Sequence, residues 1–146
     1  MIELKIKIVR DGAVVPRYQT KGASGLDLSA CLNEPVTAEP GRQVIVPTGI
    51  ALEIPVGYEV QIRARSGLAA KHGIGLTNGI GTIDSDYRGE INVILINWGE
   101  EPFEITNGMR IAQMIVAKYE QATLEITEEL SETNRNNKRF GSTGLY

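Results

Sequence analysis

The amino-acid sequence predicts an all-β protein with a sandwich, barrel or jelly-roll architecture. Residues 2–8 alternate apolar and charged side chains, which is the pattern of a strand buried on one face. The same period of two returns over residues 58–65. Turn dipeptides such as Asp11-Gly12 and Asn78-Gly79 recur at close intervals, and the chain has 16 glycines with which to build such turns.

The other predicted elements follow along the chain. Runs rich in branched apolar residues predict further strands at residues 44–46, 51–54, 91–96 and 111–116. Only residues 66–71 have a helical composition, and Ser66 is the expected N-cap of that short helix. The sequence contains no internal repeat and no interdomain linker.

The C-terminal segment has a different composition from the rest of the chain. Residues 133–146 are polar and basic, with almost no branched apolar side chains. Such a stretch cannot bury enough surface to become ordered in isolation, so its composition favours a flexible tail. Phe140 beside Arg139 offers another interpretation, in which the ring stacks on a base while cations and hydroxyls bind phosphates. We expect a β domain over residues 1–132 and a flexible segment over 133–146.

Length and composition exclude several classes of protein. The 146 residues are enough for about one domain. The net charge of −3 disfavours general nucleic-acid binding, because duplex-binding proteins carry a basic surplus. Apolar runs such as Val93–Ile96 are four residues long, whereas a membrane span needs about 20 apolar residues. The N-terminus has no signal-peptide core. We expect a soluble, cytoplasmic protein without nucleic-acid or membrane partners.

Few side chains are available for metal or acid–base chemistry. Cys31 and His72 are the only residues of their types, which excludes an intrachain disulfide and a Cys/His zinc cage. Asp84 and Asp86 are two positions apart, so on a strand they would face the same way and could bind one cation. Alternatively, one of them is a general base, or both belong to an Asp-rich turn. Because His72 is expected on a helix surface, a general base here must be a carboxylate.

A second candidate site is Arg65-Ser66-Gly67, where a predicted strand meets the predicted helix. Backbone N–H groups and the dipole at a helix N-terminus attract anions, and the Arg65 and Ser66 side chains add donors. The alternative is an ordinary capped helix with a solvated arginine.

Together these segments resemble the trimeric deoxyuridine triphosphatase (dUTPase) family over nearly the whole chain. All five motifs of that family occur in order, namely residues 23–28, residues 47–49 with 65–69, residues 81–89, residues 108–113, and Arg135 with residues 140–144. One motif alone is weak evidence, whereas five in order at suitable spacing are specific.

The resemblance implies a jelly-roll subunit of a homotrimer whose active sites are shared between subunits. The implied reaction converts dUTP and water to dUMP and pyrophosphate with Mg²⁺, which limits uracil incorporation into DNA and supplies dUMP for thymidylate synthesis. Asp84 is then the catalytic residue that deprotonates the attacking water. Tyr87 packs on the deoxyribose and leaves no room for a 2′-hydroxyl. Asp27 belongs to the water network around the metal, which binds mainly to the triphosphate.

The remaining substrate contacts are implied in the same way. The phosphates are bound by Arg65, Ser66 and Gln113, with Gly67 also in the binding set. The nucleoside pocket is bordered by Thr82, Ile83 and Asn92. The hairpin around Asn78–Asp84 reads uracil with backbone groups, helped by the Asn78 side chain. A closing tail supplies Arg135, Phe140, Gly141, Ser142 and Thr143, with Phe140 stacked on uracil.

Two departures from the family pattern affect these expectations. Residues 135–140 keep the spacing from Arg135 to Phe140, but three glycines of the usual motif are replaced. Met109 stands where an acidic residue is common, which leaves the partner of Arg110 undetermined. Two other functions fit parts of the pattern: a related dCTP deaminase, which would need a general acid/base glutamate and would lack the tail motif, and a trimeric binding module without turnover.

Overall fold

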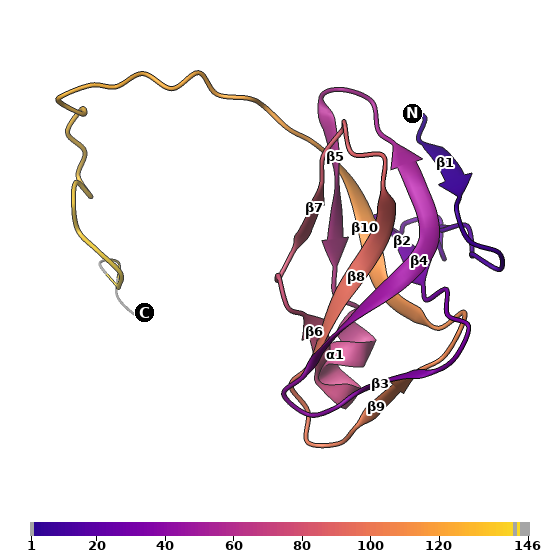
Figure 1. The fold of residues 1–146 in the computed structure, drawn as a ribbon. Coiled ribbons are helices and arrows are strands. Elements are labelled where there is room, and N and C mark those ends of the chain that lie inside the picture. The colour runs from indigo at the N-terminus through magenta and orange to yellow at the C-terminus, as the bar shows by residue number, and fades with distance from the viewer. Residues whose placement is uncertain (1, 142, 144–146) are drawn as a thin grey trace.

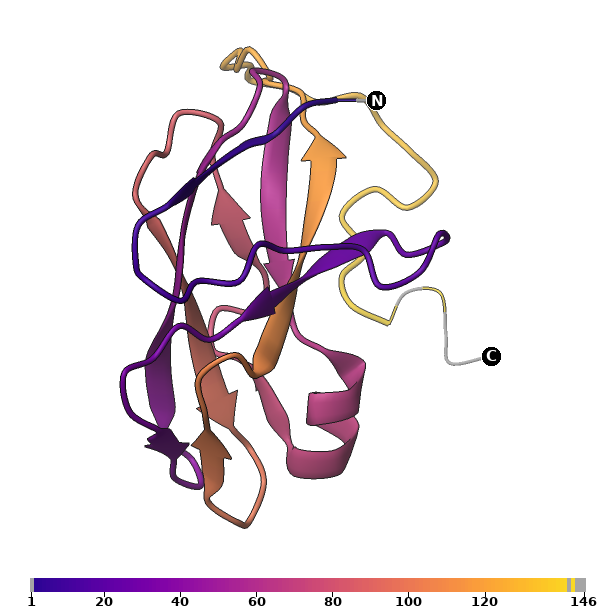
Figure 2. The same ribbon diagram turned by 90° about the vertical axis from the view of Figure 1, so that its right-hand side faces the viewer.

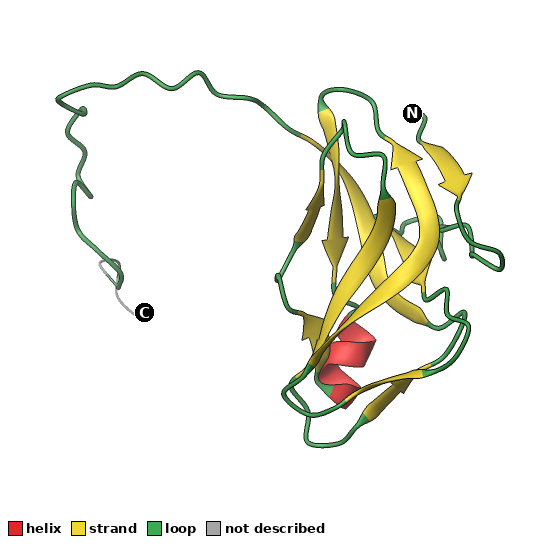
Figure 3. Cartoon of the chain, viewed as in Figure 1, coloured by secondary structure: helices red, strands yellow, loops and turns green. Residues whose placement is uncertain are grey.

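The computed structural model describes residues 2–141 and 143, so the predicted contact of Ser142 lies outside the described residues. Within them the chain forms ten strands and one short helix (Figure 3). The strands are β1 Lys5–Ile8, β2 Gly25–Ser29, β3 Val36–Ala38, β4 Gln43–Glu53, β5 Tyr58–Arg63, β6 Ile74–Leu76, β7 Gly81–Ile83, β8 Glu90–Asn97, β9 Phe103–Ile105 and β10 Arg110–Lys118, and the helix is α1 Ser66–His72. The all-β prediction is confirmed.

Two four-stranded sheets make up the body of the molecule. One has the order β1-β4-β8-β6 and the other β2-β10-β5-β7, while β3 and β9 form a separate pair near α1 (Figure 1). Every pairing between these strands is antiparallel. Figure 2 shows β10, β5 and β7 side by side, with α1 below them. This arrangement confirms the predicted sandwich.

The core lies between the sheets and follows the alternation of the strands. In β8, Ile91, Val93, Leu95 and Asn97 are buried while the intervening side chains turn outward. The same core contains Leu28 of β2 and further apolar residues, namely Val46, Ile50, Leu52, Val60, Ile62, Ile74, Leu76, Ile111 and Met114. Burial of such side chains is worth about 1.5–3 kcal/mol each, so the packed sheets form a rigid platform for residues on their outer faces and edges.

The N-terminal strand is shorter and more exposed than the sequence predicted. It begins at Lys5, and Ile8 is 47% exposed although the period-two pattern places it on the buried face. The reason is that β1 is an edge strand that pairs with β4 alone. Only Leu4 and Ile6 pack against the core from this segment.

The predicted strands at 44–46 and 51–54 are one continuous strand, β4. Its register against β8 shifts between Pro47 and Ala51, which marks a bulge. Gly49 lies in this bulge with φ +72°, a conformation that glycine adopts without steric cost. The turn signal at Pro47-Thr48-Gly49 is therefore an irregularity inside a strand rather than its end.

The helix matches the prediction to within one residue, but its cap differs. The N-cap residue is Arg65, whose side chain makes no capping hydrogen bond, and not Ser66. Gly73 ends the helix in the left-handed conformation with φ +68°. In the described part of the chain, no helix is long and apolar enough to cross a membrane.

After β10 the chain leaves the sheets. No described residue between 119 and 141 lies in a helix or strand, and Figure 1 shows this segment running away from the body. Leu124, Ile126, Leu130 and Phe140 are each at least 86% exposed. The segment thus contributes no side chain to the core.

The Asn97 side chain links the end of β8 to β3 and to the β8–β9 turn, so its removal tests this part of the fold. Its fully buried side chain donates to the carbonyls of Ala38 (2.8 Å) and Glu101 (2.7 Å) and accepts from the Gly99 N–H (2.8 Å). Because orphaned buried polar groups cost about 1–3 kcal/mol each, we expect Asn97→Ala to lower the free energy of unfolding by about 2–4 kcal/mol. Urea unfolding followed by tryptophan fluorescence measures this loss.

Asn92→Ala is the matched control for this substitution. Asn92 lies on the same strand but on its exposed face, so its truncation should change the free energy of unfolding by less than about 0.5 kcal/mol. Equal losses in the two variants would contradict the role assigned to Asn97.

Candidate functional site

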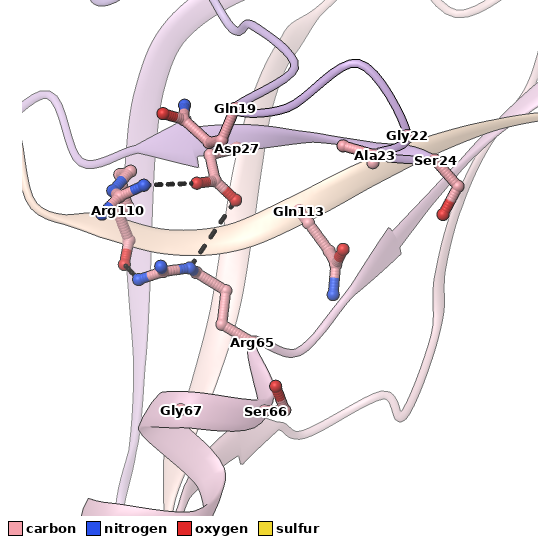
Figure 4. A pocket seen from close by; sticks show the side chains of 11 residues that line it. Gln19, Gly22, Ala23, Ser24, Asp27, Arg65, Ser66, Gly67, Arg110 and Gln113 are labelled. Carbon is pink, nitrogen blue, oxygen red and sulfur yellow. Dashed lines mark hydrogen bonds and ion pairs between the residues drawn. The ribbon is translucent and has the colours of Figure 1, made fainter.

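A polar hollow of about 480 Å³ lies across β2, β10 and the junction of β5 with α1 (Figure 4). It brings together five of the residues singled out in the sequence: Asp27, Arg65, Ser66, Gly67 and Gln113. The sheet explains this grouping, because Gln113 of β10 lies opposite Asp27 of β2 on one side and opposite Arg63 of β5 on the other. We call this hollow the cationic pocket.

The charges of the cationic pocket are organised around one carboxylate. Asp27 Oδ2 binds Arg110 Nη1 at 2.9 Å, and Asp27 Oδ1 lies 3.6 Å from Arg65 Nε. Arg65 also donates from Nη1 to the carbonyl of Arg110 at 2.9 Å. Two guanidinium groups against one carboxylate leave a net positive charge, so the pocket favours anions.

Gln113 is held beside these charges by the backbone. Its Nε2 donates to the carbonyl of Ala64 at 3.0 Å. An ideal Cβ at Gly25 would come within 2.5 Å of Gln113 Oε1, so the glycine makes room for this side chain. Figure 4 shows the amide pointing into the same space as the Ser66 hydroxyl.

Arg110 lines the cationic pocket, although the sequence assigned it no role. It is three positions from Gln113, and on a regular strand the two side chains would face opposite sides. The register of β10 against β2 shifts between Arg110 and Ala112, and this bulge brings both side chains to the cationic pocket. Arg110 therefore has an acidic partner, Asp27, although position 109 carries no acid. Met109 packs against the core instead.

A second hollow of about 420 Å³ lies on the outer face of β4 and β8, beside the β7–β8 loop. Five residues expected around a nucleoside line it: Thr82, Ile83, Asp84, Tyr87 and Asn92. Ile45, Ile91 and Ile94 supply an apolar wall. We call it the apolar hollow. Its lining suits a flat, weakly polar group, in contrast to the cationic pocket.

Asp84 lies at the rim of the apolar hollow, just after the end of β7. Since β7 ends at Ile83, Asp84 and Asp86 occupy a turn, closed by the Tyr87 N–H on the Asp84 carbonyl at 3.2 Å, and not a strand. Both aspartates border a third hollow with Glu59. In the described residues no group of three or more His, Cys, Asp or Glu side chains could hold a metal ion.

Asn78 and the tail are separate from both hollows. Asn78 is exposed in the β6–β7 turn and does not line the apolar hollow. The described tail residues Arg135, Phe140, Gly141 and Thr143 line neither hollow, and Phe140 is fully exposed. No described residue lines both hollows. Within one chain, the expected site residues thus form two groups and a detached tail.

Comparison with known proteins identifies relatives of this chain. The model of the dUTPase family matches residues 11–144. A deoxyuridine 5′-triphosphate nucleotidohydrolase of Roseobacter denitrificans is 54% identical over 99% of this chain and 97% of its own length. The enzyme of the same name from Beijerinckia indica is 58% identical over 92% of this chain and 85% of its own length.

Solved structures agree with these relatives. A dUTPase of Staphylococcus bacteriophage 80alpha, in complex with dUpNHpp, has a TM-score of 0.86 and 26% identity, and the match covers 99% of this chain and 100% of that chain. A dUTPase of phage phi11 of S. aureus, described with a structural Mg(II) ion, has a TM-score of 0.79 at 22% identity, over 88% of this chain and 98% of that chain. The resemblance seen in the five motifs is confirmed, and the chain belongs to the dUTPase family.

Proposed function

We propose that this chain is a dUTP diphosphatase that hydrolyses dUTP to dUMP and pyrophosphate. The observation that carries the proposal is the presence, in a member of the dUTPase family, of two chemically complementary hollows: one cationic, and one apolar with Asp84 and Tyr87 at its rim. The relatives named above are nucleotidohydrolases of deoxyuridine 5′-triphosphate.

The cationic pocket is the site of the triphosphate in this proposal. Arg65, Ser66 and Gln113 bind phosphate oxygens, with Gly67 beside them, and Arg110 adds a second cation. Phosphoryl transfer needs alignment and charge neutralisation more than covalent participation of the protein. The Asp27 carboxylate fixes both arginines before substrate arrives, so little side-chain entropy is lost on binding.

The apolar hollow receives the nucleoside. Tyr87 packs against the deoxyribose, Thr82, Ile83 and Asn92 border it, and the hairpin around Asn78 contacts uracil. Asp84 accepts a proton from the water that attacks the α-phosphorus. A new P–O bond forms there, the bond from the α-phosphorus to the β-phosphate bridging oxygen breaks, and pyrophosphate leaves. The exposed carboxylate of Asp84 is accessible to that water.

Mg²⁺ is the cofactor in this proposal, and it neutralises triphosphate charge when bound. The described residues offer no cage of three acidic or imidazole ligands, which suits a cation held mainly by phosphate oxygens and water. Asp27 engages each carboxylate oxygen with one arginine. Because each oxygen can accept a second hydrogen bond, Asp27 can also bind a water of the metal.

The active site is complete only in a homotrimer. The cationic pocket and the apolar hollow share no residue, so a second subunit can bring its apolar hollow against the cationic pocket of the first. The segment 133–146 then closes as a lid: Arg135 and residues 141–143 bind the outer phosphates, and Phe140 stacks on uracil. Its exposed position and its lack of helix or strand in the described residues support such a movement.

Release of pyrophosphate from dUTP, dCTP, dTTP, dATP, dGTP and UTP tests the proposed function directly. We expect rapid release from dUTP and little from the other nucleotides. Ammonia release from dCTP would indicate the related deaminase instead. Nucleotide binding without any product would indicate a trimeric binding module.

Asp84→Asn tests the assignment of the general base. The change is nearly isosteric, but the amide cannot accept the proton of the water, so kcat should fall by about 10²–10⁴-fold. Binding of a non-hydrolysable dUTP analogue should remain. Asp86→Asn is the control, since Asp86 lies in the same turn but not in the apolar hollow. A kcat within about threefold of the parent for Asp84→Asn would show that another group is the base.

Mixed trimers test whether sites are shared between subunits. One variant lacks residues 134–146 and the other carries Asp84→Asn, and each should be inactive alone. If Asp84 and the tail reach a site from different subunits, equal amounts refolded together should recover about a quarter of the parent activity, from ½ × ½ of the sites. If both come from one chain, no site is complete and no activity returns.

A further inference from the structure

The Tyr87 ring is held in one place by the two residues that follow Arg88. Its hydroxyl donates to the carbonyl of Glu90 at 3.0 Å. The ring lies over Gly89, where an ideal Cβ would come within 2.6 Å of Tyr87 Cζ. No side chain other than hydrogen fits at Gly89 without moving the ring, so the position of Tyr87 depends on where the backbone of residues 89–90 lies.

Glu90 is fixed by three N–H donors. Arg10 binds its carboxylate through two bonds, Nε to Oε1 at 2.6 Å and Nη2 to Oε2 at 3.0 Å. The Gly49 N–H donates to the same Oε1 at 3.0 Å. The hydrogen bond from Arg10, helped by that from Gly49, holds the pKa of Glu90 below its usual value.

The bulge in β4 makes this arrangement possible. Gly49 turns its N–H toward Glu90, while its carbonyl accepts from the Val9 N–H (2.8 Å) and the Arg10 N–H (3.4 Å). A side chain at Gly49 would collide with Ala13, whose Cβ lies 2.6 Å from the position of an added Cβ. The proposed reaction assigns no contact to the Pro47-Thr48-Gly49 motif. Through Gly49, this motif connects the segment that follows β1 to Glu90.

The ion pair between Lys5 of β1 and Glu53 of β4 shows what an ordinary surface pair looks like. Lys5 and Glu53 join β1 to β4 through one contact of 2.8 Å, and their side chains are 66% and 50% exposed. Exposed pairs of this kind contribute about 0–1 kcal/mol. The Glu90 side chain is only 20% exposed, is bound at both oxygens and lines the apolar hollow. Its backbone carbonyl is also the acceptor for Tyr87.

We propose that Glu90, held by Arg10 and the Gly49 N–H, is a positioning residue that sets the place of the Tyr87 ring and thereby the exclusion of ribonucleotides. The inference rests on the proposed function, in which the ring occupies the space of a 2′-hydroxyl. Exclusion of one hydroxyl by a ring is a steric effect, so it fails when the ring can move away. Glu90 prevents that movement by anchoring the start of β8 to Arg10, in the segment that follows β1, and to Gly49 of β4.

The test compares UTP with dUTP in the variants Arg10→Gln and Glu90→Gln. Loss of the anchor should raise the ratio of kcat/KM for UTP to that for dUTP on the order of tenfold. In Arg10→Gln, whose side chain lines neither hollow, kcat for dUTP should change little. Arg10→Lys keeps the charge but makes a single contact, so its ratio should be intermediate. Tyr87→Phe keeps the ring and loses the hydroxyl, and it should raise the ratio in the same way; combined with Glu90→Gln it should add nothing further.

Lys5→Gln and Glu53→Gln are the matched controls, since they break an ion pair between β1 and β4 whose side chains bond to each other and not to Tyr87 or Glu90. An unchanged ratio in both Arg10→Gln and Glu90→Gln would overturn the proposal, as would an equal rise in the controls. Arg10 is about half exposed, so its variant should fold even if Glu90→Gln does not. Calorimetric binding of dUDP and UDP gives a ratio of affinities for the two sugars without turnover, and this ratio should shift in the same variants. A parent inactive on dUTP would then contradict the proposed function alone.

Discussion

Strand β10 is the constraint on which the rest of the site depends. It pairs with β2 on one edge and with β5 on the other, and it thereby places Gln113 between Asp27 and the end of β5 that leads to Arg65. A slip of one residue would turn every side chain of the strand to the opposite face. The burial of Ile111, Ala112 and Met114 in the core prevents such a slip. The core therefore fixes the register, and the register fixes the cationic pocket.

In each hollow a carboxylate holds cationic side chains or a backbone N–H group in place before any ligand binds. Asp27 holds two arginines in the cationic pocket. Glu90 binds Arg10 and the Gly49 N–H, and its carbonyl binds Tyr87 beside the apolar hollow. Neither carboxylate is deeply buried, so neither pays the full desolvation penalty of an interior charge. The benefit is preorganisation, because side chains already in place lose little entropy when a ligand binds.

The bulges in β10 and β4 each bring a donor to one of these carboxylates, Arg110 to Asp27 and the Gly49 N–H to Glu90. In β10 the bulge brings Arg110 to the same face as Gln113. In β4 the bulge lets the Gly49 N–H donate to Glu90, while the Gly49 carbonyl accepts from the N–H groups of Val9 and Arg10. Each bulge interrupts a ladder of hydrogen bonds and in return directs one functional group that a regular strand would direct elsewhere. The described residues of the segment 133–146 make no hydrogen bond to the sheets, and Phe140 remains exposed.

The sequence by itself determined the fold class, the longer strands and the family. Alternation over residues 58–65 and branched residues over 91–96 and 111–116 correspond to β5, β8 and β10, because side-chain periodicity is local information. The strands β3, β6, β7 and β9 have three residues each, too few to show a period. The motifs identified Asp27, Arg65, Asp84 and Tyr87 by residue type and spacing.

Only the tertiary structure decided how these residues are grouped. The partner of Arg110 lies 83 positions away, and that of Arg10 lies 80 positions away. Pairings at that separation depend on strand register across the sheets, which no local pattern encodes. The bulge in β10 makes prediction harder still, because one extra residue reverses which face a side chain occupies. For this reason the sequence could nominate only candidate residues, whereas the packing of the sheets grouped those that line a hollow into two sets and placed the Tyr87 hydroxyl on the Glu90 carbonyl.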